Sequence, residues 1–332
     1  MKILITGAYG FVGTNLCKFL KEKGHVCDAL DLPAARREDV PYAAFHSWDE
    51  IPSSLTLTSN LDFSSYDAVV HLAGKAHDLK EVASEQSYFD INVGLTQRIF
   101  NALRVKVESG GGGRRTTFIY FSSSKADANG NAYGRSKLAA EEWLQDQYSS
   151  SVSTSNLHLC ILRPAMIHGP GNKGNLNLLW GITRRGLPWP LASFENRRSF
   201  TAIGNICAAV EALCECGENG VYPIADDEML STNRVIELIA EACGRKAKLW
   251  RLPRGLMTQA AKMGDVFHLP LNSERLKKLT ESCVVSNDKI KKALGWETMP
   301  VSAEEGMRRT LESFGNKQWA IGNGQRARGR EK

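Results

Sequence analysis

Short apolar runs alternate with longer amphipathic stretches through the first half of the chain. The short runs have the length of strands, and the longer stretches repeat apolar residues with the period of a helix. Strands that alternate with helices predict an α/β fold with a Rossmann-type, doubly wound parallel sheet. We expect strands at about 3–6, 25–30, 68–72, 118–122 and 159–164, and helices at about 10–23, 88–107 and 133–148.

Proline and glycine become frequent directly after residue 164, in the run HGPGNKGN. Because such punctuation ends regular structure, we expect the sheet domain to cover 1–164 and a smaller C-terminal lobe to cover 165–316. The segment 200–216 is expected to pack back on the first domain. The glycine-rich run 109–115 predicts a surface loop.

The composition is that of a globular protein, with 332 residues of which 42% are hydrophobic. The sequence has no apolar run long enough to span a bilayer, and MKILITG at its start lacks the charged region of a signal peptide. We therefore expect a cytoplasmic protein without membrane insertion. Eight scattered cysteines without a CxxC motif favour reduced thiols and no metal site.

The net charge of +6 is concentrated at the end of the chain. The last sixteen residues, 317–332, hold five basic residues against one acidic residue, which is a net +4. This stretch contains three glycines and no apolar period, so we expect a basic, disordered tail. The remaining body is nearly balanced, which argues against a nucleic-acid partner.

Three glycines, Gly7, Gly10 and Gly13, follow the first predicted strand and open the first predicted helix. Glycine permits a sharp turn and a close approach of the backbone to a pyrophosphate. The start of the helix adds N–H groups without intrahelical acceptors and the positive end of its dipole. This spacing between a strand and a helix predicts a dinucleotide site.

An acidic residue, Asp31, ends the second predicted strand, about twenty residues after the glycines. A carboxylate there accepts hydrogen bonds from the ribose hydroxyls of adenosine and repels a 2′-phosphate, which favours NAD over NADP. Arg36 and Arg37 follow closely. Whether they receive a 2′-phosphate or are solvated loop charges stays open at this stage.

Tyr133 and Lys137 lie four residues apart in YGRSK, so a helix presents both on one face. A nearby ammonium favours the phenolate and is expected to lower the pKa of the tyrosine. Such a tyrosine can exchange a proton with a sugar hydroxyl while a hydride moves to or from the cofactor. The strand FIYF ends in three serines, residues 122–124, at the sheet edge where doubly wound folds bind ligands.

Six motifs together resemble the extended short-chain dehydrogenases/reductases, and more narrowly the NAD-dependent epimerase/dehydratase family, over about residues 1–314. They are GAYGFVG, VVHLAGKAH, INVGLT, FSSS, YGRSK and ILRPAMIHGPG, in the order of the family. The resemblance implies NAD as cofactor, a nucleoside-diphosphate sugar as substrate, and Ser123, Tyr133 and Lys137 as catalytic residues. It also implies that Tyr133 and Lys137 contact the cofactor together with Phe11, Val12, Leu72, Ala73, Gly74, Lys75, Asn92 and Pro164.

The resemblance extends to the binding of the sugar nucleotide. NRRSFTAIGNI is similar to the family segment whose arginine grips the diphosphate, which assigns this role to Arg198. Asn175 matches an asparagine placed against the nucleotide, Lys173 is expected to assist, and Arg275 is a candidate second phosphate contact. The alternative, in which these arginines only pair with acids, stays open.

Three reactions in this family share the oxidation of carbon 4 or its reverse. Dehydratases carry Asp-Glu after the catalytic serine or threonine, whereas this chain has Ser124-Lys125, which disfavours dehydration. Similarity to a bacterial subgroup favours a UDP-hexose or UDP-N-acetylhexosamine 4-epimerase acting by transient oxidation of carbon 4. The alternative is an NAD(P)H-dependent UDP-4-keto-sugar reductase in surface polysaccharide synthesis.

The segment between Ser123 and Tyr133 departs from the family pattern. These residues are ten positions apart, whereas relatives have some twenty or more. A third hypothesis is therefore an NAD(H)-binding protein without turnover. The family also implies a homodimer built from the helices expected at 88–107 and 133–148, and candidates for its interface are Ile99, Leu103, Leu138, Trp143 and Leu144.

Overall fold

The computed structural model describes residues 1–51, 61–75, 84–109, 115–150, 156–172, 176–267 and 271–328. The chain divides into two compact units. The first unit contains residues 1–165, 205–224 and 286–298, and the second contains 166–204, 225–285 and 299–332.

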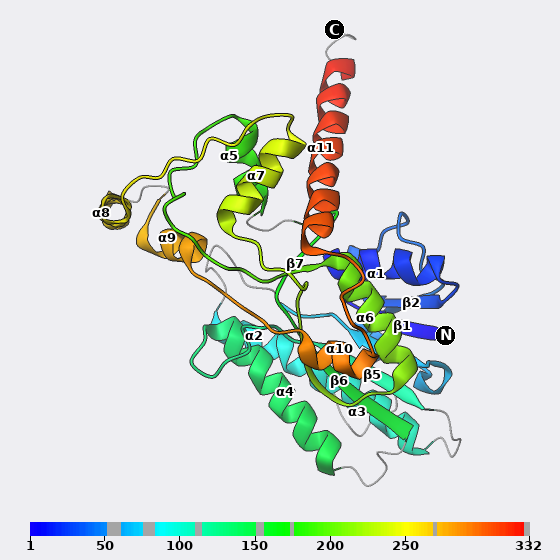
Figure 1. Ribbon diagram of the computed structural model, residues 1–332. Helices are drawn as coiled ribbons and strands as arrows, with labels where there is room; N and C mark the ends of the chain where they lie inside the picture. The colour runs from blue at the N-terminus through cyan, green and yellow to red at the C-terminus, as the bar shows by residue number, and fades with distance from the viewer. Residues whose placement is uncertain are drawn as a thin grey trace. The chain divides into compact units, whose positions relative to one another are not determined.

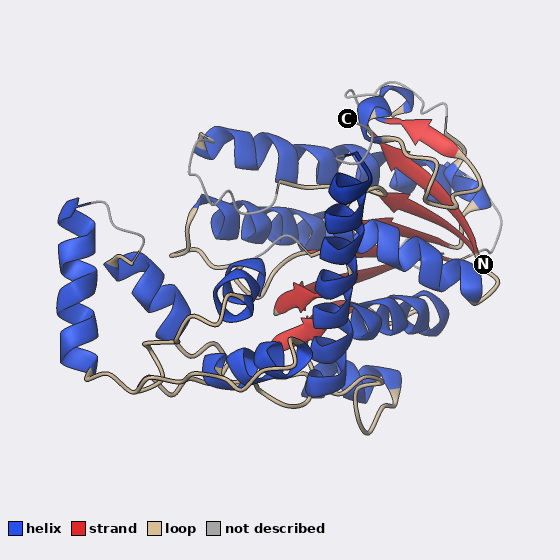
Figure 2. Ribbon diagram, turned by 90° about the horizontal axis from the view of Figure 1, so that it is seen from above, coloured by secondary structure: helices blue, strands red, loops and turns tan. Residues whose placement is uncertain are grey.

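The first unit is built on a sheet of seven parallel strands in the order β3-β2-β1-β4-β5-β6-β9, flanked by helices (Figure 1, Figure 2). Its central strands are buried on both faces, which explains why they consist of continuous apolar runs. The predicted α/β fold with a doubly wound parallel sheet is confirmed. The strands are β1 (Lys2–Thr6), β2 (Val26–Asp31), β3 (Phe45–Ser47), β4 (Ala68–His71), β5 (Thr116–Phe121), β6 (Leu157–Pro164) and β9 (Gly220–Ile224).

The helices of this unit follow the strands along the chain. They are α1 (Phe11–Glu22), α2 (Glu85–Asn92), α3 (Gly94–Ser109), α4 (Ala132–Ser150), α6 (Ile203–Cys216) and α10 (Asp288–Leu294), with short 3₁₀ turns η1 (Pro33–Ala35), η2 (Trp48–Glu50) and η3 (Phe63–Ser65). The first residues of α6, 203–204, are counted with the second unit. The loop expected at 109–115 lies mostly outside the described residues.

The single helix expected at 88–107 is divided into α2 and α3 at Val93. The hydroxyl of Thr96 donates to the carbonyl of Asn92 at 2.6 Å, in the turn where the two helices meet. A threonine hydroxyl that bonds to a carbonyl four residues earlier bends a helix. The prediction of one continuous helix is therefore wrong, although both halves are helical.

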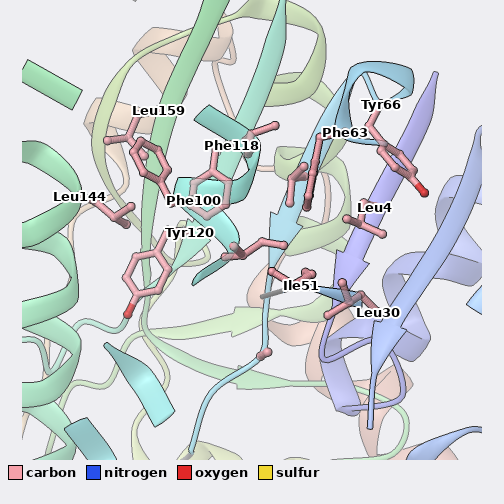
Figure 3. Close-up of a cluster of buried hydrophobic side chains, with 14 of the residues drawn as sticks. Leu4, Leu30, Ile51, Phe63, Tyr66, Phe100, Phe118, Tyr120, Leu144 and Leu159 are labelled. Atoms are coloured by element: carbon pink, nitrogen blue, oxygen red, sulfur yellow. The ribbon is translucent and has the colours of Figure 1, made fainter. Parts of the chain in front are cut away.

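Helices α3 and α4 bury their apolar side chains in the main core of the first unit (Figure 3). Phe100 meets Phe118 of β5 edge to face at 5.3 Å and Trp143 of α4 at 5.9 Å. Ile99, Leu103 and Leu144 are fully buried in the same core. The choice of these three as interface residues is wrong, because they face the sheet; the homodimer itself stays a prediction.

The second unit contains a small two-stranded parallel sheet and five helices among its described residues. Its core is formed largely by leucines together with Trp180, Trp189 and Phe200. The elements are β7 (Met166–His168), β8 (Phe200–Ala202), α5 (Leu176–Arg184), α7 (Thr232–Ala242), α8 (Arg254–Phe267), α9 (Ser273–Thr280) and α11 (Ala303–Arg328).

The division of the chain differs from the expected boundaries at two places. Residues 200–204, expected to return to the first domain, belong to the second unit, where β8 pairs with β7. Residues 286–298, expected in the second lobe, belong to the first unit, where α10 packs against β9. Both differences arise from pairings between distant segments, which a local sequence pattern does not reveal.

The end of the chain also differs from expectation. We expected a disordered tail over 317–332, but the backbone of α11 continues as a helix to Arg328. No proline occurs between 303 and 328, and a helix that is already nucleated extends with one hydrogen bond for each added residue. Across the described part of the chain, no helix has both the length and the apolar character needed to cross a membrane.

Candidate active site

The sheet brings the predicted site residues of the first unit to one edge. Strands β1, β2, β4, β5 and β6 run parallel, so their carboxyl ends lie together (Figure 1). This edge carries the glycine turn 7–13 with Phe11 and Val12 at the start of α1, Asp31 at the end of β2, residues 72–75 after β4, Ser123 after β5 and Pro164 at the end of β6.

The glycine turn is packed so tightly that side chains are excluded from it. Gly7 has a φ of 65°, and a Cβ atom there would lie 2.8 Å from the backbone nitrogen of Ala73. A Cβ atom on Gly13 would lie 2.5 Å from the carbonyl oxygen of Ala8. Gly10 is the N-cap residue of α1 and has no side chain that could accept a hydrogen bond from the helix. The first N–H groups of α1 are therefore available to an anion. This turn fits the pyrophosphate of a dinucleotide.

Asp31 is held in place by two backbone N–H groups. Tyr9 donates to one of its carboxylate oxygens at 3.0 Å and Leu32 donates to the other at 2.8 Å. Each carboxylate oxygen keeps capacity for a second hydrogen bond, such as one from a ribose hydroxyl. Arg37 donates to the Thr14 hydroxyl at 2.9 Å and forms an ion pair with Asp39 at 3.4 Å. Its guanidinium is therefore bound by side chains of the same chain.

Asn92 joins the loop after β4 to helix α4. Its side-chain oxygen accepts from the backbone N–H of Lys75 at 2.7 Å, and its amide nitrogen donates to Ser136 at 2.9 Å. Ser136 in turn donates to the carbonyl of Tyr133 at 2.9 Å. A Cβ atom on Gly74 would lie 2.8 Å from the oxygen of Asn92 and 3.2 Å from the nitrogen of Lys137, so glycine keeps the space that both side chains need.

Lys137 is buried on α4 and faces the sheet. Its ammonium donates to the carbonyl of Phe121, at the end of β5, at 2.7 Å, and it lies 4.9 Å from the centre of the Tyr120 ring. Burial lowers the pKa of Lys137 to about 8, although the nearby carboxylate of Glu141 opposes this shift. The lysine is therefore still mostly charged at neutral pH.

Ser123 and Tyr133 form a second pair at the same edge. The Ser123 hydroxyl accepts from the backbone N–H of Lys125 at 3.1 Å, and its hydrogen bond to Tyr133 favours the phenolate. Burial nevertheless raises the pKa of Tyr133. We expected Lys137 to lower this pKa; within the chain alone that expectation is wrong, because burial dominates and the ammonium is not among the causes of the shift.

The short segment between Ser123 and Tyr133 is fixed to the start of α4. Asn131 accepts from the N–H of Gly134 at 3.0 Å, as a helix cap does. Arg135 donates to the carbonyl of Gly130 at 2.5 Å and pairs with Glu85 of α2 at 2.7 Å. The shortened segment thus brings a well-anchored Tyr133 to the sheet edge. The ring of Tyr133 meets Tyr88 edge to face at 6.5 Å.

A buried chain of hydrogen bonds beneath the edge was not anticipated, although His71 lies within the motif VVHLAGKAH. Ala73 donates its N–H to the Thr6 hydroxyl at 3.1 Å. His71 lies 2.7 Å from Thr6 through Nδ1 and 3.0 Å from Thr96 through Nε2. Because Thr96 donates to the Asn92 carbonyl, His71 must donate from Nε2 and accept at Nδ1. One tautomer thus connects the loop after β4 with Asn92.

A buried carboxylate below the reacting groups was also missed. Glu141 is fully buried on α4, one turn after Lys137, and accepts from Nε of Arg163 at 2.9 Å and from Nη2 at 2.5 Å. This pair of hydrogen bonds raises the pKa of Arg163. Since a buried carboxylate is stable as an ion only with such a partner, the pair joins α4 to β6 beneath the site.

In the second unit, Arg198 lies in a loop that bridges to Leu230 and Cys283. Its guanidinium donates to the carbonyl of Lys278 at 2.6 Å, and burial lowers its pKa without removing its charge. Arg275 is exposed near the start of α9, where its N–H is capped by Asn272 at 2.8 Å. Lys173 and Asn175 lie outside the described residues.

Comparison with known proteins identifies the same family that the sequence motifs indicate. The profile of the NAD dependent epimerase/dehydratase family matches residues 3–225. A UDP-glucose 4-epimerase from Vibrio cholerae is 28% identical over 94% of this chain and 95% of that protein. An Escherichia coli O157:H7 enzyme named N-acetyl-α-D-glucosaminyl-diphospho-ditrans,octacis-undecaprenol 4-epimerase is 25% identical over 93% and 94%.

Reductases and solved structures are also among the relatives. A Pseudomonas aeruginosa UDP-2-acetamido-2,6-β-L-arabino-hexul-4-ose reductase is 35% identical over 145 residues, 44% of this chain and 31% of that protein. The Bordetella bronchiseptica enzyme WbmF, solved with NAD⁺ and UDP, has the same fold, with a TM-score of 0.70 and 20% identity over 99% and 97% of the chains. The chain therefore belongs to the NAD-dependent epimerase/dehydratase family of enzymes, among the relatives of nucleotide-sugar epimerases and reductases.

Proposed function

We propose that the protein is an NAD-dependent 4-epimerase of a UDP-hexose or UDP-N-acetylhexosamine. The observation that carries this proposal is the arrangement at the carboxyl edge of the sheet. Ser123 is hydrogen-bonded to Tyr133, and Lys137 is buried one helical turn from that tyrosine. These groups lie beside a glycine turn and Asp31, which are suited to a pyrophosphate and an adenosine ribose.

In this mechanism the residues of the chain move protons and hold the substrate. Bound NAD⁺ supplies the reversible acceptance of a hydride from carbon 4 of the sugar. Tyr133 takes the proton of the 4-hydroxyl during oxidation and returns it when the ketone is reduced on its opposite face. Ser123 holds the reacting oxygen. The ammonium of Lys137 adds positive charge beside the cofactor site, held there by the carbonyl of Phe121.

The substrate is proposed to carry a nucleoside diphosphate, and the protein is proposed to bind it by this group. Arg198 carries a charged guanidinium that can donate to diphosphate oxygens from the N–H groups that Lys278 does not engage. Relatives solved with UDP-glucose or UDP support this assignment. Lys173, Asn175 and Arg275 are proposed to assist, and NAD is proposed over NADP because Asp31 would repel a 2′-phosphate.

A 4-keto-sugar reductase is the second candidate. The observation that favours it is the reductase from Pseudomonas aeruginosa, which is 35% identical over 145 residues of this chain. A reductase uses the same proton donor but consumes NAD(P)H in each turnover. The two functions therefore differ in the fate of the cofactor rather than in the reacting residues.

The test is incubation of the full chain with UDP-glucose, UDP-N-acetylglucosamine, a UDP-4-keto sugar and an N-acetylglucosaminyl diphosphopolyprenol, each with and without added NAD(P)H. We expect a 4-epimer from a UDP-sugar with no net consumption of cofactor. A product that forms only with stoichiometric oxidation of NAD(P)H would identify the reductase. If only the diphosphopolyprenol substrate were turned over, the group by which the protein binds its substrate would not be a nucleotide.

A further inference from the structure

Helix α8 of the second unit has two apolar faces, and only one of them is covered. Met257, Ala261 and Gly264 are buried where α8 packs beside α9 (Figure 1). A second set of apolar side chains is open to solvent. It consists of Leu256, Met263, Val266 and Phe267, which are 54%, 58%, 71% and 66% exposed.

The exposed set forms one stripe along the helix. Leu256, Met263 and Phe267 are separated by seven and four residues, so they lie above one another on one side, with Val266 next to them. Single exposed apolar residues need no explanation, but several on one helical face mark an interaction site. We refer to these four residues as the α8 stripe.

The sequence around the stripe is strongly basic. Residues 245–278 contain nine basic and two acidic residues, a net +7, whereas the whole chain carries +6. The rest of the chain therefore sums to −1. The two acids are engaged, since Asp265 accepts from Ser273 at 2.9 Å and Glu274 pairs with Lys278. All nine basic residues are exposed: Arg245, Lys246, Lys248, Arg251, Arg254, Lys262, Arg275, Lys277 and Lys278.

We propose that the α8 stripe docks this protein on the surface of an anionic phospholipid bilayer. An amphipathic helix with large apolar residues on one face and cations around it lies in the plane of a membrane interface. The apolar side chains enter the region between headgroups and acyl chains, and the cations meet the negative headgroups. The helix has 14 residues, about 21 Å, which is too short to span the bilayer.

The charge selects this partner over the alternatives. A second copy of the chain would bring another +7 segment against the first, and like charges repel. A nucleic acid would satisfy the cations, but its phosphates offer nothing to the apolar stripe. An anionic lipid surface meets both features at once. This inference does not depend on the proposed reaction, because it concerns a surface in the second unit only.

The test measures co-sedimentation of the full chain with vesicles. Vesicles of phosphatidylcholine mixed with phosphatidylglycerol are compared with vesicles of phosphatidylcholine alone. We expect strong binding to the anionic vesicles only. Met263→Glu/Phe267→Glu should reduce that binding by more than about tenfold, since it removes buried apolar area and adds charge of the wrong sign. Each of Arg251→Gln and Lys262→Gln should reduce it roughly fivefold, and added salt should weaken it.

The control is Leu178→Glu, which places the same charge at an exposed apolar residue of α5 in the second unit, 55% exposed. It should bind the anionic vesicles within about twofold of the parent chain, because Leu178 belongs neither to the α8 stripe nor to the basic segment 245–278. Equal binding of parent and double variant, or equal binding to both kinds of vesicle, would overturn the proposal. It would also be overturned if the parent sedimented as a dimer without vesicles and the double variant as a monomer.

Discussion

At the carboxyl edge of the first unit's sheet, charged and polar side chains are buried, whereas on α8 of the second unit large apolar side chains are exposed. Each arrangement is unfavourable unless something compensates for it. At the edge the compensation is internal: Asn92, Lys137, Glu141 and His71 each have hydrogen-bond partners within the chain. On α8 no described side chain covers the stripe, and the compensation that we propose is an anionic lipid surface.

The difference indicates where each region does its work. An edge at which the charged side chains are held by hydrogen bonds suits chemistry, because reacting groups must be held in place before the substrate arrives. An open apolar stripe suits reversible attachment, which needs area rather than exact positions. The first region should therefore respond to the loss of single atoms, and the second to changes in area and charge.

The largest expected effect is at Tyr133. Tyr133→Phe removes one oxygen and keeps the ring against Tyr88, so we expect kcat to fall about a hundredfold or more with little change in KM, as for other acid–base residues. Steady-state kinetics measures both constants, with the substrate identified by the incubation test described above. Tyr148→Phe, at the far end of the same helix, serves as the control and should keep the parental kcat. If Tyr133→Phe turned over at the parental rate, the carboxyl edge of the sheet would not carry out the reaction.

His71→Phe tests the internal compensation beneath the edge. The ring stacks against Phe118 and Tyr120 at about 6 Å, and phenylalanine keeps this packing. The change removes the acceptor of the Thr6 hydroxyl and the donor to Thr96, so we expect a loss of about 2–3 kcal/mol in the free energy of unfolding. Denaturant titration measures it. A loss below about 0.5 kcal/mol, as for a surface site, would contradict the buried chain of bonds.

The pH dependence of this loss provides a second check. Burial lowers the pKa of His71 to about 3, so the folded protein keeps the ring neutral while the unfolded chain protonates it below about 6.5. The parent therefore loses stability as pH falls from 6.5 toward 3, and His71→Phe lacks this term. The gap between parent and variant should narrow as the pH is lowered through that range.

We predict that Lys137 sets an upper pH limit on activity. Since its folded-state pKa is lowered to about 8, the ammonium is lost as pH rises through that value. We expect kcat to decline above about pH 8, by about tenfold for each further pH unit, if the charged form is required. The weaker activity of Lys137→Met should lack this decline. A parental profile that stays flat to pH 10 would show that the charge of Lys137 is not used.

The smallest expected effect is at Arg198, in the second unit. A diphosphate is gripped equally before and during the reaction, so Arg198→Ala should raise KM roughly tenfold and leave kcat within about twofold. Arg197→Ala, at an exposed neighbouring position, is the control. A fall in kcat alone would place Arg198 among the positioning residues of the reaction. Unfolding of both variants should be compared, since Arg198 also holds the carbonyl of Lys278.

Local pattern and chemistry predict part of this site. The glycine turn, Asp31 and the Tyr133–Lys137 spacing are short-range features, and parallel strands necessarily bring them to one edge. The partners of His71 are 65 and 25 residues away, and Arg163 is 22 residues from Glu141. Such pairings depend on the packed fold, as does α10 against β9. The near-balance of residues 1–316, a net +2, concealed the basic segment 245–278, because the other residues of 1–316 sum to −5.

The central claim is that the sheet edge oxidises and re-reduces carbon 4 of the sugar. The most direct test uses the sugar nucleotide identified by the incubation test. It is deuterated at carbon 4 and converted in ordinary water without added cofactor. We predict that the 4-epimer keeps its deuterium at carbon 4 and that turnover is slower than with the unlabelled substrate, because the same hydride leaves and returns. Deuterium replaced by solvent hydrogen, or a 4-epimer formed without any isotope effect in a single turnover, would contradict the account.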